Sequence, residues 1–375
     1  MIEFRNVTKK FSGTTVLKDI SLKINKGEIV TLVGPSGCGK TTSLKMINRL
    51  IKPTSGSIFI NGIDISKKDV IALRRNLGYV IQQTGLFPHM NVQENIEIIS
   101  RLSNTNSEVL LHKTCELMEL VGLEPEVFLK RYPSELSGGQ QQRVGFARAF
   151  SMDPDVILMD EPFSALDPIT RLSLQDELIN LQRQFKKTIV FVTHDMDEAI
   201  KIADRLCIMN KGEVIQYDTP ENILKKPINE YVTEFVGAKR IWLNADFIKA
   251  ADFMSEDLFT CTPKLGILKC LEIMRKNGLD NMLVTDVHTR RLLGIFYPRN
   301  LPLDFNKTAL VEDFMVREYP TVCRDTSIIK VLKLVDRYQV ENIPVLDCNN
   351  VLQGLITKTN LLATLSQQYL LTEVG

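Results

Sequence analysis

Short apolar runs, bounded by glycine, proline or charged residues, recur in the first half of the chain. Three of them have the length of buried strands: EIVTLVG (28–34), DVILMDEP (155–162) and TIVFVTHD (188–195). Two other segments space their apolar residues as a helix does, SLKMINRL (43–50) and the run within LSGGQQQRVGFARAF (136–150). Strand and helix patterns that alternate along a chain are typical of an α/β domain.

This pattern weakens after Asp218. The following segment, 219–247, carries two prolines, dense charge and the only tryptophan, Trp242. It is predicted to form a helical tail of the first domain and then a connector, with Trp242 packed against that domain.

An internal repeat with an offset of 61 residues follows the connector. The segment ADFM (251–254) matches EDFM (312–315), and 267–286 matches 328–347. RLLGIF (291–296) then matches VLQGLI with one residue lost in the turn. Each unit is predicted to run helix, strand, turn, strand, helix. Units of about sixty residues are marginal alone, so the two are expected to pack as a pair.

The overall composition is that of an ordinary globular protein. The 375 residues are 44% hydrophobic and 24% charged, with a formal net charge of +1. Such a balance gives no sign of a nucleic-acid surface, so no nucleic-acid partner is expected. No apolar run reaches the length of a membrane helix, and the N-terminus lacks an apolar signal core. The seven cysteines form no CxxC and are interpreted as free thiols in a reducing cytosol.

A phosphate-binding loop follows the first predicted strand. The spacing Gly34-x-x-x-x-Gly39-Lys40-Thr41 lies between a strand and a helical run, which is the context this motif requires. Its glycines allow backbone N–H groups to close around a β-phosphate. Lys40 can reach the β and γ oxygens, and the Thr41 hydroxyl can hold Mg²⁺. The alternative is a glycine-rich turn before an ordinary helix, and the adjacent Lys-Thr pair argues against it.

Carboxylates and a histidine end the other two predicted strands. Asp160 can hold the water shell of Mg²⁺, and Glu161 can orient and polarise an attacking water. His194 follows the third strand, where it can contact a γ-phosphate. Alone, an acidic pair or a single histidine is more often structural, and the phosphate loop in the same chain favours the functional interpretation.

A second candidate anion site opens the helical run at 136–150. Ser137, Gly138 and Gly139 precede the helix, and such a start leaves free N–H groups without side-chain bulk. The chain therefore holds two phosphate-binding helix starts, which one nucleotide does not require.

The order of these motifs resembles the ATPase subunit of ABC transporters. The resemblance covers roughly the first 235 residues and rests on Gly34–Thr41, Gln82, LSGGQ (136–140), ILMDE (157–161), SALD (164–167) and His194. It implies ATP and Mg²⁺ as ligands, with Glu161, His194 and Gln82 as catalytic residues and Thr41, Gln82 and Asp160 at the metal. The residues it implies for nucleotide binding are Phe11 (where tyrosine is more usual), Gly34, Pro35, Ser36, Gly37, Cys38, Gly39, Lys40, Thr41, Thr42, Ser137, Gly138, Gly139, Gln140 and Asp167.

The same resemblance explains the second helix start. In the family two ATPase domains face each other head to tail, and the Ser-Gly-Gly helix start of one closes over the γ-phosphate held by the other. One set of motifs per chain implies a second chain, and the absence of an alternative half-set favours a homodimer. The segment after Gln82 matches the region that meets the membrane partner.

The C-terminal repeat resembles a tandem CBS pair. GLITKTNLL (354–362) matches the CBS motif, and GIFYPRNLP in the first unit is a degraded version. Thr357 and Asn360 match the positions that usually bind ribose, although Asn360 replaces the usual Asp and the first unit offers Tyr297 and Asn300. The resemblance implies an adenine nucleotide in the cleft, with cyclic di-AMP as the preferred candidate. A purely structural dimerisation module is the open alternative.

Together these features predict an α/β chain: a P-loop NTPase domain of the ABC type with a helical subdomain (1–236), a linker (237–250) and two CBS domains (251–308 and 309–368). This architecture is similar to the ATP-binding subunit of quaternary-amine importers, which take up glycine betaine, carnitine, choline or proline betaine. The implied partners are integral membrane permease subunits and an extracellular substrate-binding protein, with the chain peripheral at the cytoplasmic face of the membrane. Two alternatives remain open, a soluble ABC ATPase in another process and a nucleotide sensor dominated by its CBS pair.

Overall fold

The computed structural model describes residues 1–82, 85–102, 106–237, 247–302 and 304–363. The chain divides into two compact units, Met1–Val236 and Gly237–Gly375. Most of the predicted linker, Trp242 included, and the end of the second predicted CBS domain lie outside the described residues.

A six-stranded sheet forms the centre of the first unit, in the order β10-β9-β3-β8-β7-β6. All neighbours are parallel except β10, which runs antiparallel to β9. The three strands predicted from apolar runs are confirmed as β3, β7 and β8, which are buried at every position. The six strands are β3 (Ile29–Val33), β6 (Leu77–Val80), β7 (Val156–Asp160), β8 (Thr188–Thr193), β9 (Arg205–Asn210) and β10 (Glu213–Asp218).

The two faces of this sheet are covered differently. On one face, side chains such as Leu32 and Val190 pack with helix α1 (Lys40–Ile47) and with a second, antiparallel sheet. The strands of that sheet lie in the order β2 (Thr14–Ile24), β1 (Ile2–Phe11), β4 (Ser55–Ile60) and β5 (Ile63–Asp64). On the opposite face, side chains such as Ile157 and Phe191 pack with helices α3 (Val92–Arg101), α6 (Gly138–Phe150) and α7 (Pro168–Phe185).

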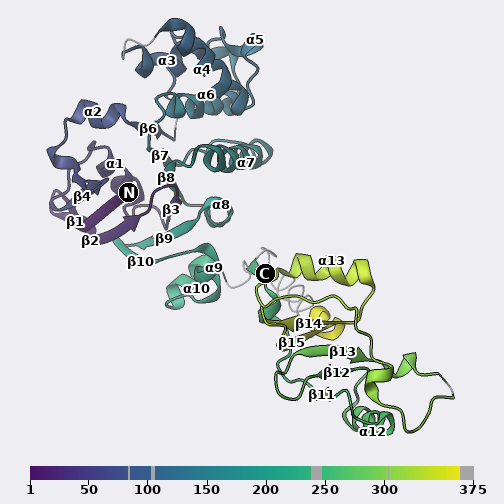
Figure 1. Cartoon of the computed structure of the whole chain (residues 1–375). Helices are drawn as coiled ribbons and strands as arrows, with labels where there is room; N and C mark the ends of the chain where they lie inside the picture. The colour runs from purple at the N-terminus through teal and green to yellow at the C-terminus, as the bar shows by residue number, and fades with distance from the viewer. Residues whose placement is uncertain (83–84, 103–105, 238–246, 303, 364–375) are drawn as a thin grey trace. The chain divides into compact units, whose positions relative to one another are not determined.

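Figure 1 shows α3, α4 (Ser107–Leu120) and α6 gathered as a helical group of the first unit, which is the predicted helical subdomain. The remaining helices of this unit are α2 (Val70–Arg75), α5 (Pro125–Phe128), α8 (Met196–Ile202), α9 (Pro220–Lys225) and α10 (Glu230–Val236), with 3-10 turns η1 (Ile65–Lys67) and η2 (Pro133–Glu135). The last two helices are the predicted helical tail.

The second unit consists of the two repeats. The first holds β11 (Thr260–Cys261), α12 (Ile267–Asn277), β12 (Met282–Thr285) and β13 (Leu292–Phe296), and the second holds α13 (Ile328–Tyr338), β14 (Asn342–Leu346) and β15 (Leu352–Thr357). The pairing of Cys261 with Val284 recurs 61 residues later as a bridge between Val322 and Val345, so the sequence repeat is also a structural one.

The repeats exchange their leading segments. Lys249, ahead of the first repeat, bridges to Ser327 of the second, and Leu310 bridges to Gly266 of the first. The cores agree, because Phe253, the C-cap residue of turn η4 (Ala250–Asp252), packs in the core of the second repeat. Val311 in turn η6 (Val311–Asp313) packs in the core of the first. Each repeat is therefore completed by the other.

One element of the predicted repeat is wrong. The helix expected at the end of the first repeat is only the 3-10 turn η5 (Pro298–Asn300). Pro298 is the first residue of this turn, a position that tolerates proline. Pro302 lies two residues after the turn, lacks an N–H group and disfavours helical backbone at Leu301, which is extended, so no α-helix continues there. The short strand β11 before α12 was not anticipated either.

Candidate functional site

The predicted catalytic residues of the first unit lie at one edge of its central sheet. The phosphate loop follows β3, Asp160 ends β7, His194 follows β8 and Gln82 follows β6. These four strands are parallel and adjacent in the order β3-β8-β7-β6, so their carboxyl ends lie in a row. Ligands of open parallel sheets bind at this edge.

The phosphate loop has a backbone that only glycine adopts easily. Gly39 has φ of 106°, and a Cβ there would lie 2.3 Å from Leu17 Cδ2. Lys40 is 6% exposed and its Nζ donates to the carbonyls of Gly34 and Pro35, at 2.6 and 3.0 Å. The ammonium is thus held against the loop while Pro35, Ser36 and Gly37 stay exposed for a ligand.

Cys38, inside the loop, is buried, and burial raises the pKa of its thiol while the Lys40 ammonium opposes the rise. Its neutral side chain packs inward with the core, so Cys38 contributes its backbone to the loop.

A pair of oxygen donors lies beside the loop. Thr41 Oγ1 donates to Asp160 Oδ1 at 2.7 Å, although 119 residues separate them, and Asp160 is 8% exposed. A hydroxyl and a carboxylate at this distance suit Mg²⁺, which prefers oxygen ligands and keeps several waters or phosphate oxygens. These residues therefore fit the metal that the sequence implies.

Glu161 is the meeting point of three strand ends. His194 Nδ1 lies 3.2 Å from Glu161 Oε2, and Gln82 Nε2 donates to the same oxygen at 3.5 Å. The backbone of Glu161 has φ of 47°, its N–H donates to Val192 O at 3.0 Å, and Ser164 Oγ donates to its carbonyl. The carboxylate is thus aimed at the sheet edge by contacts on both sides.

The second helix start lies elsewhere. Ser137 is exposed and exchanges hydrogen bonds with Gln140 at the start of α6, on the sheet face opposite to α1. A Cβ at Gly138 would meet nothing of its own chain within 4 Å. Asp167 caps α7 by accepting from Thr170 N at 3.0 Å, and these hydrogen bonds lower the pKa of its carboxyl. The helix start at Ser137 and the helix that follows the phosphate loop thus pack on opposite faces of the sheet.

Phe11 ends β1 with 42% of its surface exposed. Lys9 Nζ lies 4.5 Å from the centre of its ring and donates to Lys52 O. The ammonium of Lys9 lies against the Phe11 ring, and the exposed surface of the ring remains open for stacking. Lys9 was missed from the sequence, although its i, i+2 spacing from Phe11 on a strand puts both on one face.

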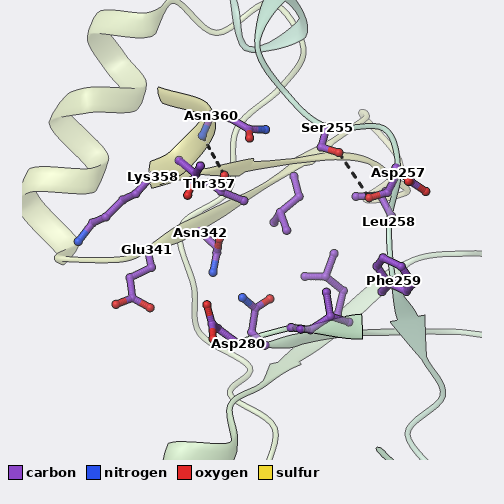
Figure 2. A pocket seen from close by; sticks show the side chains of 16 residues that line it. Ser255, Asp257, Leu258, Phe259, Asp280, Glu341, Asn342, Thr357, Lys358 and Asn360 are labelled. Atoms are coloured by element: carbon purple, nitrogen blue, oxygen red, sulfur yellow. Dashed lines mark hydrogen bonds between the residues drawn. The ribbon is translucent and has the colours of Figure 1, made fainter. Parts of the chain in front are cut away.

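The second unit contains a cavity of about 490 Å³ that both repeats line. Thr357, the last residue of β15, and Asn360, three residues later, both line it (Figure 2). Asn360 N donates to Thr357 Oγ1 at 3.1 Å, and Asn360 Nδ2 donates to Phe253 O at 3.4 Å. Asn360 therefore offers its amide oxygen to a ligand. Tyr297 and Asn300 are not among the lining residues.

Acid–amide pairs at equivalent positions of the two repeats also line this cavity. Asp280 and Asn281 follow α12, and Glu341 and Asn342 follow α13. Figure 2 shows Asp280 across from Glu341 and Asn342. These four residues were missed, although the offset of 61 aligns them in the sequence. Lys358 is the cation in the lining, with Asp257 as a further carboxylate.

Among the described residues, every helix is too short or too polar to traverse a bilayer.

Family models match both units of the chain. The ABC transporter model matches residues 17–164, and the CBS domain model matches 250–301 and 311–367. The two CBS matches coincide with the two repeats.

Curated relatives match nearly the whole chain. The carnitine transport ATP-binding protein OpuCA of Listeria monocytogenes is 45% identical over 363 residues, 96% of this chain and 91% of the relative. The glycine betaine/carnitine/choline transport ATP-binding protein OpuCA of Bacillus subtilis is 44% identical, over 96% of this chain and 95% of the relative.

The first unit is also similar to solved structures. A dimeric ATP-binding cassette in a post-hydrolysis state, bound to ADP and Pi, is 35% identical with a TM-score of 0.54. It covers 59% of this chain and 99% of its own. The CbiO1 protein of Clostridium perfringens, part of an ABC transporter complex, has a TM-score of 0.57 at 26% identity, over 65% of this chain and 94% of its own.

Proposed function

This chain belongs to the ATP-binding subunits of ABC transporters, and on that premise we propose that it powers the import of quaternary-amine osmolytes. The observation that carries the proposal is its 45% identity, over 96% of its length, to a carnitine transport ATP-binding protein. The similarity spans both the nucleotide-binding unit and the paired repeats. Glycine betaine, carnitine and choline, named by the relatives, define the solute class.

The hydrolytic step falls to residues at the sheet edge. Lys40 leaves the carbonyls of Gly34 and Pro35 to contact the β and γ oxygens of ATP. Thr41 and Asp160 would hold Mg²⁺, which would neutralise charge on the phosphates. Glu161 orients the attacking water and accepts its proton, and Gln82 and His194 hold the Glu161 carboxylate in place.

Each nucleotide-binding site is completed by a second copy of the chain. The Ser137–Gly139 start offers free N–H groups and a helix N-terminus, and helix α1, which follows the chain's own phosphate loop, packs on the opposite sheet face. A head-to-tail homodimer brings the start of one copy to the γ-phosphate held by the other. The similarity to a dimeric cassette supports this arrangement.

The chain acts with other proteins at the membrane. Transport requires integral permease subunits, and we infer that they bind this subunit at the cytoplasmic face and that an extracellular protein delivers the solute. Exposed Phe87, five residues after Gln82, lies in the segment that the family uses for this contact.

Uptake of labelled solutes tests the proposed class. In cells lacking other osmolyte importers, expression of this chain with its permease is expected to restore uptake of at least one of glycine betaine, carnitine and choline at high salt. Uptake of none of them, with the complex assembled in the membrane, would contradict the solute class.

We also propose that the cavity between the repeats binds an adenine nucleotide, with cyclic di-AMP as the preferred ligand. Thr357 and the Asn360 amide oxygen can bond ribose hydroxyls, and Lys358 can face a phosphate. The Asp280 and Glu341 carboxylates can accept from the amino group of adenine. Binding there regulates the ATPase if the ligand prefers one state of the dimer, and coupling of about 1–3 kcal/mol is typical.

Calorimetric titration tests this ligand. The full chain with Lys40→Ala, which removes the competing ATP site, is titrated with cyclic di-AMP, AMP and ATP. Thr357→Val keeps the shape and loses the hydroxyl, so the affinity is expected to fall about tenfold, equivalent to about 1.4 kcal/mol. An absence of heat with all three ligands up to millimolar concentration would leave the repeats a structural module.

A further inference from the structure

The guanidinium of Arg171, on α7, contacts two loops of the catalytic edge. Its Nη2 donates to Leu166 O at 3.1 Å, in the Ser164–Asp167 segment that follows β7. Its Nη1 lies 3.8 Å from Asp195 Oδ2 and its Nε lies 3.7 Å from Glu198 Oε1, in the turn and helix that follow β8. One side chain therefore bridges the segments on either side of the two strand ends.

The acceptors of Arg171 hold the backbone around His194. Thr193 Oγ1 donates to Glu198 Oε2 at 2.7 Å and accepts from Asp195 N at 3.0 Å. Asp195 caps α8 by accepting from the N–H groups of Asp197 and Glu198. His194 lies between Thr193 and Asp195, so the residues before and after it are both fixed by this network.

The Thr193–Glu198 part of the network is shielded from water, whereas the side chains of Arg171 and Asp195 are 30% and 34% exposed. Thr193 is 2% exposed, and the Glu198 side chain is 7% exposed. Burial raises the pKa of the Glu198 carboxyl, whereas the Thr193 hydrogen bond and the Arg171 charge oppose that rise. Without Arg171, Glu198 would be a buried carboxylate next to Asp195, and such a group protonates or moves toward solvent.

The first turn of α7 also packs against the start of α6. A Cβ built on Gly139 would lie 2.6 Å from Thr170 Cγ2, so Thr170 packs directly beside the start of α6. Thr170 N is held by Asp167, and Arg171 is the next residue. The start of α6 and the His194 turn thus contact neighbouring residues of one helical turn.

We propose that Arg171 is a positioning residue that couples the Ser137–Gly139 helix start, through the first turn of α7, to His194. This inference rests on the proposed function, in which the helix start serves the partner's nucleotide and His194 serves the chain's own. When the partner's nucleotide binds against the start of α6, it displaces or fixes the first turn of α7. The guanidinium of Arg171 transmits that change to the Thr193–Asp195 backbone. Each site thereby responds to nucleotide in the other.

The bridge needs the shape of arginine as well as its charge. Leu166 O accepts a hydrogen bond from Nη2, and the Asp195 and Glu198 carboxylates pair with the charge at 3.8 Å from Nη1 and 3.7 Å from Nε, so three different nitrogens of one planar group are used. Lysine offers one compact ammonium and reaches only part of this set. Arg171→Lys is therefore expected to behave more like Arg171→Gln than like the unaltered protein.

Steady-state ATP hydrolysis by the full chain tests the proposal. Arg171→Gln is expected to lower kcat about 10–100-fold, the usual scale for a misplaced catalytic group, with KM changed less than about threefold. Glu198→Gln keeps an acceptor for Thr193 and is expected to lower kcat in the same direction by a smaller factor. Arg183→Gln, at an exposed position of the same helix, is the matched control and is expected to keep the original rate.

A second background separates positioning from a general structural effect. If Arg171 acts through His194, Arg171→Gln in a His194→Ala chain is expected to cause less than about a threefold further loss of kcat. A full further loss in that background, or kcat within twofold of the unaltered protein for both Arg171→Gln and Glu198→Gln, would overturn the proposal. An unaltered chain that hydrolyses no ATP would contradict the proposed function itself, and the coupling with it.

Discussion

Replacing Glu161 with glutamine is expected to leave ATP binding intact and to lower turnover about 10²–10⁴-fold. That range is the usual contribution of a general base and corresponds to about 3–5 kcal/mol of barrier. Glutamine keeps the shape of the side chain, which His194 and Gln82 contact within 3.5 Å, but cannot accept the proton of the attacking water. The variant is therefore expected to accumulate as an ATP-bound dimer.

Two measurements decide this prediction. Phosphate release gives turnover, and size-exclusion chromatography with ATP gives the dimer fraction. Lys40→Ala is the contrasting variant, because it removes the charge that contacts the phosphates and is expected to lose binding itself. Glu161→Gln protein that hydrolyses ATP at the original rate would exclude Glu161 as the base.

Mixing two inactive variants is expected to recover part of the activity if the nucleotide sites are shared between copies. Gly138→Asp adds a carboxylate at the exposed start of α6, where a Cβ meets nothing of its own chain within 4 Å, so folding should survive while the partner's phosphate is repelled. Lys40→Ala inactivates the other half of the site. In a mixed dimer one site carries both changes and the other carries neither.

The recovery has a defined upper limit. Random pairing of equal amounts gives about half mixed dimers, so about one quarter of all sites is intact. Each variant alone is the control, and affinity tags on the two chains report whether mixed dimers form. If tagged mixed dimers form and still hydrolyse no ATP, the two loops would have to act within one chain.

The catalytic edge could be predicted from the sequence because its chemistry is local. The spacing from Gly34 to Thr41 and the carboxylates after an apolar run each follow a strand, and parallel strands bring their carboxyl ends together. The pair Thr41 and Asp160 is the clearest case, because 119 residues separate two side chains that lie 2.7 Å apart. The resemblances to ABC ATPases and to CBS domains are both confirmed by the family models.

The exchange of leading segments between the repeats could not be predicted. ADFM and EDFM have nearly the same apolar pattern, so either segment satisfies either core equally well. Only the three-dimensional pairing of Lys249 with Ser327 and of Leu310 with Gly266 shows which repeat each segment completes. The helix expected at the end of the first repeat is absent for a simpler reason, because Pro302 lacks an N–H group and ends the turn that begins at Pro298.

The contacts of Arg171 could not be predicted from the sequence either. On a helix pattern it is an ordinary polar position, and its three contacts lie in the segment after β7, at the N-cap of α8 and in α8 itself. Which of them it reaches depends on the rotation of α7 about its axis, which the packing of Leu174, Leu178 and Leu181 against the sheet determines.

The most direct test of the central claim is to measure uptake and hydrolysis together. Proteoliposomes holding the chain, its permease and its binding protein are loaded with MgATP and given labelled glycine betaine, carnitine or choline outside. Uptake is expected to require internal ATP, to proceed with phosphate release, and to stop in complexes carrying Glu161→Gln. Uptake at the original rate by the Glu161→Gln complex, or without internal ATP, would contradict the claim that this chain powers transport.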